Sequence, residues 1–116
     1  MSAALFPAPI QDQLVANFRI NQAGLVEIDH RPVVKLFTPD AQATWLLTEL
    51  DPCKELLFGL CDLGIGFPEL GYVALPELVC LRGPLGLPVE RDRFFEAGKP
   101  LSVYVEEARA AGAVVS

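Results

Sequence analysis

The chain has 116 residues, of which 52% are hydrophobic, and its 9 basic and 15 acidic residues give a formal net charge of −6. This length predicts one domain, residues 1–116, and the hydrophobicity excludes a disordered chain. The basic residues are scattered, so direct nucleic-acid binding is not expected. The sequence shows neither an export signal nor an apolar run near the ~18 residues of a membrane span.

Cys53, Cys61 and Cys80 have no metal-binding spacing and leave an odd thiol under any pairing. Because His30 is the single histidine, we expect no zinc site, and the sequence indicates no cofactor. Unpaired thiols are typical of a reducing compartment, so the sequence indicates a cytoplasmic protein. The apolar excess of so small a domain also favours self-association as a homodimer.

The chain begins with a predicted helix over residues 9–22, where Pro9 suits the first turn and apolar residues recur at helical spacing. A connector follows over residues 25–32, with a brief alternation that predicts an edge strand at residues 26–28. Residues 33–37 are rich in β-branched side chains and predict a strand.

A β-hairpin is predicted next, with strands over residues 43–50 and 56–63. In the first strand, alternation places Trp45, Leu47 and Glu49 on one face and Leu46, Thr48 and Leu50 on the other. The second strand is apolar on both faces, which is typical of a central strand covered on both sides.

Residues 64–71 form a predicted loop containing Gly64, Gly66 and Gly71, whose backbones supply positive φ angles and close approach. The elements expected after it are a strand over residues 70–75, a short helix over 76–83 ended by Gly83, an edge strand over 89–95 and a last helix over 100–112. The predicted fold is therefore α+β: an antiparallel sheet of about four or five strands, with N- and C-terminal helices and one short internal helix.

The glycine loop is the candidate contact surface. It has no phosphate-binding glycine motif, and it presents Phe67, Leu70 and Tyr72 with Glu69 at the rim. Aromatic anchors with few charges at the centre are typical of protein interfaces. These residues therefore predict binding to an unidentified protein partner.

Carboxylates around the hairpin offer an alternative, a small metal-dependent hydrolase, if Glu49, Asp51, Asp62 and Glu69 converge in space. Asp62 precedes a glycine and is also expected to cap loop amides. A nucleophilic pair of Cys61 and His30 is a weaker hypothesis. The acidic balance leaves a third reading, an inhibitor that mimics DNA against a nucleic-acid enzyme.

Several long runs resemble the bacterial domain-of-unknown-function family numbered 2958, and the resemblance covers roughly residues 33–104. The runs are KLFTPDA at 35–41, ATWLLTELDP at 43–52, FGLCDLGIGFPELGYV at 58–73, GLPVERD at 86–92 and KPLSVY at 99–104. The resemblance implies a small stand-alone bacterial domain carried near plasmid or conjugative-element genes, with no assigned activity or site residue. The chain departs from the family pattern at Cys53-Lys54, where a more acidic segment is usual, and at Pro76, where a small capping residue is usual.

Overall fold

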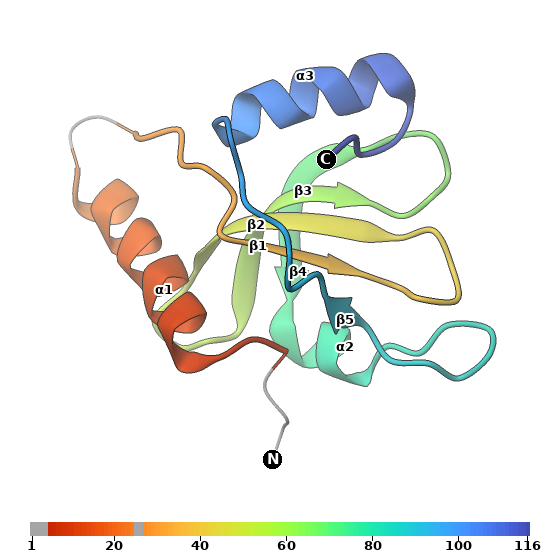
Figure 1. Cartoon of the computed structure of the whole chain (residues 1–116). Coiled ribbons are helices and arrows are strands. Elements are labelled where there is room, and N and C mark those ends of the chain that lie inside the picture. Colours follow the sequence, from red (N-terminus) through yellow and green to blue (C-terminus); the bar gives the residue numbers. More distant parts are fainter. Residues whose placement is uncertain (1–4, 25–26) are drawn as a thin grey trace.

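The computed structural model describes residues 5–24 and 27–116. Within these residues the chain forms three helices and five strands, which confirms the predicted α+β fold (Figure 1). The helices are α1 (Ala8–Ala23), α2 (Leu75–Cys80) and α3 (Leu101–Ala111), and the strands are β1 (Val34–Phe37), β2 (Thr44–Leu50), β3 (Leu56–Asp62), β4 (Glu69–Ala74) and β5 (Glu90–Arg91). In the described part of the chain, no helix is long and apolar enough to cross a membrane.

The strands form one antiparallel sheet in the order β4-β3-β2-β1-β5, with α1 and α3 on opposite faces (Figure 1). Alternation along β3 sends Leu57 toward α1 and α2, and Leu60 toward α3. The prediction that this strand is central and covered on both sides is therefore confirmed. The buried core on the α1 side is Phe6, Leu14, Val34, Leu36, Trp45, Leu47, Leu50, Leu57, Leu78 and Val89, and on the α3 side Leu46, Leu60, Leu101, Tyr104, Val105 and Ala108.

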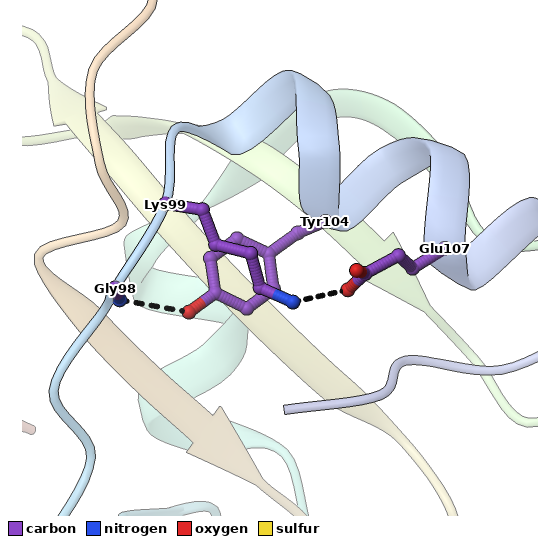
Figure 2. A network of polar contacts seen from close by, with 4 residues as sticks. All are labelled: Gly98, Lys99, Tyr104 and Glu107. Carbon is purple, nitrogen blue, oxygen red and sulfur yellow. Dashed lines mark hydrogen bonds and ion pairs between the residues drawn. The ribbon is translucent and has the colours of Figure 1, made fainter.

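Helix α3 is fixed to the segment before it through Tyr104 (Figure 2). The buried Tyr104 hydroxyl accepts a hydrogen bond of 3.2 Å from the Gly98 amide, and the Lys99 ammonium lies 4.8 Å from the centre of the ring. Lys99 also forms an ion pair with Glu107 one turn further along the helix. The helix ends at Gly112, whose φ of 77° is the left-handed conformation expected of a terminating glycine. These contacts hold α3 over the sheet.

Strand β2 contains a β-bulge that the sequence did not predict. Leu47 pairs with Gly59, but the next pair is Glu49 with Phe58, so Thr48 is an extra residue. The expected alternation is therefore wrong beyond Leu47, since Leu50 joins the α1 core and Glu49 turns to the α3 face.

Two predicted elements are shorter than expected. Helix α2 ends at Cys80, because the chain turns back so that the Gly83 amide donates to the Leu87 carbonyl at 3.0 Å. Strand β5 covers only Glu90–Arg91, since the Asp92 carboxylate accepts the Phe94 amide at 2.9 Å and starts a turn.

The edge strand predicted at residues 26–28 is not formed by residues 27 and 28, and residue 26 lies outside the described part of the chain. The backbone of Ile28 bonds to the side chain of Asn21 instead of to another strand: the Ile28 amide donates to Asn21 Oδ1 at 2.8 Å, and Asn21 Nδ2 donates to the Ile28 carbonyl at 3.0 Å.

Candidate functional site

The loop between β3 and β4 is fixed at its base by Asp62. This carboxylate is 3% exposed, and its two oxygens accept the amides of Gly64 at 2.8 Å and Val114 at 2.9 Å. The prediction that Asp62 caps a loop amide is confirmed, and the bond to Val114 adds the C-terminal tail to the same anchor. Both carboxylate oxygens of Asp62 thus bind the chain's own backbone.

Two glycines shape the loop. Gly64 and Gly66 have φ angles of 81° and 91°, a conformation that other residues rarely adopt. A side chain at Gly64 would also press on Gln42 of the β1–β2 turn, whereas Gly66 has open space around it. The loop is therefore packed at its base and free at its tip.

The tip of the loop exposes large apolar side chains. Phe67 is 75% exposed, and Leu63 and Ile65 beside it are also exposed. Phe67 was a predicted contact residue and Leu63 was not, because Leu63 was expected to belong to the strand over residues 56–63. The signal available in the sequence was the alternation of apolar residues with glycines from residue 63 to residue 67.

Strand β4 begins at Glu69, so the predicted loop 64–71 is three residues too long at its end. Gly71 lies within this strand and needs no positive φ, and a Cβ placed there would contact nothing within 4 Å. Its predicted role in the loop backbone is therefore wrong. A glycine inside a strand often marks a place where another backbone can approach closely.

Leu70 and Tyr72 point from β4 to the α3 face of the sheet and remain exposed. Tyr72 is 68% exposed and stacks on Phe58 of β3, with 5.1 Å between ring centres and planes tilted by 54°. Glu69 pairs with Cys61 and so lies on the opposite face. Three of the four predicted contact residues therefore lie in β4, and the fourth, Phe67, lies in the loop just before it.

The carboxylates that would have formed a catalytic cluster lie apart. Glu49 is opposite Phe58 and Asp62 is opposite Thr44, which separates the two acids along the sheet by roughly 13 Å. Glu69 is on the other face from Asp62, and Asp51 accepts the amides of Glu55 and Leu56 in the β2–β3 turn. Among the described residues no group of three His, Cys, Asp or Glu side chains can hold a metal ion. The convergence that the alternative hydrolase requires is therefore not formed.

The pairing of Cys61 with His30 is not formed either. The Cys61 thiol packs against the α1-side core, and its nearest polar contact is the Gly59 carbonyl at 3.9 Å. Burial raises the pKa of this thiol, which favours the unreactive protonated form. His30 lines a cavity beside Phe58 and Leu101, on the α3 face.

These features define a class of α+β domain in which helices cover both faces of an antiparallel sheet, and one loop and one edge strand expose apolar side chains. Over residues 5–115 the chain matches the family described as Protein of unknown function (DUF2958), and it belongs to that family. The match extends beyond the resemblance over residues 33–104 to nearly the whole chain. No curated protein and no solved structure matches the chain significantly.

Proposed function

We propose that this domain is a protein-interaction module, and that it binds an extended segment of another protein along β4 and the loop over residues 63–68. The observation that carries the proposal is that β4 lies at the end of the sheet and, within the described residues, pairs only with β3. An unpaired strand edge presents a row of backbone donors and acceptors to an added strand.

The side chains around this edge suit such an addition. Leu70 and Tyr72 flank Gly71, which leaves the middle of the strand open to an approaching backbone. Phe67 offers an exposed aromatic ring next to the strand, the kind of side chain that dominates binding energy at interfaces. Backbone hydrogen bonds would supply affinity, and the apolar side chains would supply specificity.

Charge favours a partner other than a second copy of the chain. The net charge is −6, and the charged residue within β4 is Glu69. Two copies would repel each other, whereas a segment with basic residues would be attracted. We therefore choose a segment that alternates apolar and basic residues as the occupant.

The setting that we infer is the bacterial cytoplasm, near plasmid or conjugative-element genes. The support is the family resemblance and the state of the thiols, because Cys53, Cys61 and Cys80 are all unbonded. Free thiols are typical of a reducing compartment.

Peptide display provides the test. Random peptides displayed on phage are selected on the whole chain and counter-selected on the variant Tyr72→Lys, which places a charge on the edge. We expect enriched peptides to alternate apolar and basic residues, and to bind Tyr72→Lys and Phe67→Ala at least about tenfold more weakly than the unchanged chain. The matched control is Phe94→Ala, because this ring is 94% exposed but follows β5 at the other edge.

Three results would overturn the proposal. Selected peptides that bind all variants equally would place the contact elsewhere. A large fall in the melting temperature of Phe67→Ala would assign this ring to the core. Sedimentation that shows a dimer lost in Tyr72→Lys and kept in Phe94→Ala would make a second copy the occupant.

A further inference from the structure

A cavity of about 230 Å³ lies on the α3 face of the sheet, between the segment that precedes β1 and the start of α3. Its floor comes from β2, β3 and β4, so three neighbouring strands contribute to it. The lining residues are Glu27, Ile28, Asp29, His30, Thr48, Glu49, Phe58, Leu70, Leu101 and Ser102. This volume is below that of most pockets for drug-sized ligands, and it suits one small group or one long side chain.

Glu49 lines this cavity because of the bulge in β2. Without the bulge, Thr48 would pair with Phe58, and Glu49 would lie opposite Leu57 on the α1 face. The bulge is held from α1, where the buried Asn17 side chain donates to the Thr48 carbonyl at 3.0 Å. Bulges commonly re-aim a side chain next to a functional site. A buried polar bond thus maintains the orientation of one carboxylate.

The walls of the cavity are held in place before any ligand arrives. Asn21 Nδ2 donates to Glu49 Oε2 at 3.0 Å and also bonds to the Ile28 backbone. The Asp29 carboxylate accepts the Ser102 amide at 3.1 Å and the Ser102 hydroxyl at the first turn of α3. Preorganised polar groups lower the free-energy cost of binding.

The charge in the cavity is uncompensated. Glu27, Asp29 and Glu49 line it and no lysine or arginine does, and within the described residues Glu49 has no ion-pair partner. His30 also lines the cavity, and its ring nitrogen Nε2 is buried and has no hydrogen-bond partner among the same residues. That nitrogen accepts a hydrogen bond when it carries no proton. The remaining surface is apolar, from Phe58 and its neighbours.

We propose that this cavity binds a cationic group carried on an apolar stem, an alkylammonium or a guanidinium. The charged end would bond to the free oxygen of Glu49 beside the His30 ring, and the stem would lie on Phe58 and Leu70. The site shares Leu70 with the proposed protein contact but goes beyond it, because it depends on Glu49, which that contact does not use. An uncompensated carboxylate and an apolar floor are the complement of such a group.

The test is a titration of the whole isotope-labelled chain with n-butylammonium, followed by amide chemical shifts. We expect saturable shifts in the lining residues with a dissociation constant on the order of 1–10 mM, as befits so small a ligand. The uncharged 1-butanol should produce none. In Glu49→Gln the amide can still accept the bond from Asn21, but loss of the charge should weaken binding about tenfold. The matched control Glu90→Gln removes the same charge at β5 and should bind like the unchanged chain.

A second titration separates two sources of the cation. Nα-acetyl-lysine methylamide carries the same ammonium between two peptide groups, and it should bind at least as tightly if a protein side chain is the ligand. Tighter binding of n-butylammonium would indicate a free amine, and both results support the site. The proposal is overturned if butanol shifts the same residues, if Glu49→Gln binds like Glu90→Gln, or if no lining residue shifts. Peptide binding is tested with variants of Phe67 and Tyr72 and cation binding with a variant of Glu49, so the two proposals fail separately.

Discussion

Strand β4 and strand β5 form the two edges of the sheet, and they differ in length, charge and shape. Strand β5 has two residues, both charged, and the turn at Asp92 ends it. Strand β4 has six residues, one of them charged, and Gly71 leaves its middle open. Short, charged edges are a common protection against pairing with other chains. The comparison indicates that one edge is protected and the other is free to pair.

Beside each edge strand, an aspartate side chain accepts a backbone amide, but the two aspartates differ in burial. Asp62 and Asp92 each accept the amide two residues further on, at 2.8 Å and 2.9 Å. Asp62 is buried and also binds Val114, whereas the Phe94 amide that Asp92 accepts is exposed. The loop that precedes β4 is therefore anchored by two hydrogen bonds to a buried carboxylate.

The largest loss of stability is expected from a change that separates β3, on which the β4 edge depends, from β2. A Cβ at Gly59 would stand 2.1 Å from the Leu46 carbonyl oxygen, which is backbone and cannot move aside easily. We expect Gly59→Ala to lower the free energy of unfolding by about 3 kcal/mol, measured by urea denaturation.

The matched control is Gly71→Ala in the next strand, where the new methyl meets nothing within 4 Å. This variant should change stability by less than about 0.5 kcal/mol. If Gly59→Ala lost as little stability as Gly71→Ala, β3 would tolerate a side chain at Gly59. The packing of β3 against β2 would then differ from the one described.

A smaller effect is expected from the two aspartates. Asp62→Ala removes a buried carboxylate and leaves the amides of Gly64 and Val114 without their acceptor, so we expect a loss of about 2 kcal/mol in the free energy of unfolding. Asp92→Ala removes bonds to water-accessible groups and should lose less than about 1 kcal/mol. Amide hydrogen exchange at Gly64 should accelerate in the first variant alone, and no acceleration there would contradict the anchoring role of Asp62.

Local patterns predicted most of the elements. Pro9, Gly112 and the alternation along β3 set the two terminal helices and the central strand, because helix ends and strand faces depend on neighbouring residues. The exposure of Phe67 and Tyr72 also followed from a loop and strand poor in charge. These features need no information about distant parts of the chain.

The bulge in β2 could not be predicted in this way. The run from Leu46 to Leu50 has leucines in both phases of the alternation, so the sequence does not show a one-residue slip. The position of the bulge is fixed by the hydrogen bond from the Asn17 side chain to the Thr48 carbonyl. Asn17 lies in α1, 31 residues earlier in the chain. The separation of Glu49 from Asp62 likewise depends on the strand register. Tertiary pairing decided these positions, and with them the cavity.

The labelling rates of the three thiols give the most sensitive test of how firmly β4 is held against β3. Cys61 lies on β3 directly opposite Glu69 of β4, and burial raises its pKa, whereas Cys53 and Cys80 are exposed. At mildly alkaline pH less of Cys61 is the reactive thiolate, so iodoacetamide should label it at least about tenfold more slowly than the other two. Mass spectrometry of the digested chain gives the three rates, and labelling in urea should equalise them. Cys61 is partly buried, and detachment of β4 would expose it further and raise its labelling rate. A rate equal to that of Cys80 would mean that β4 is not held against β3.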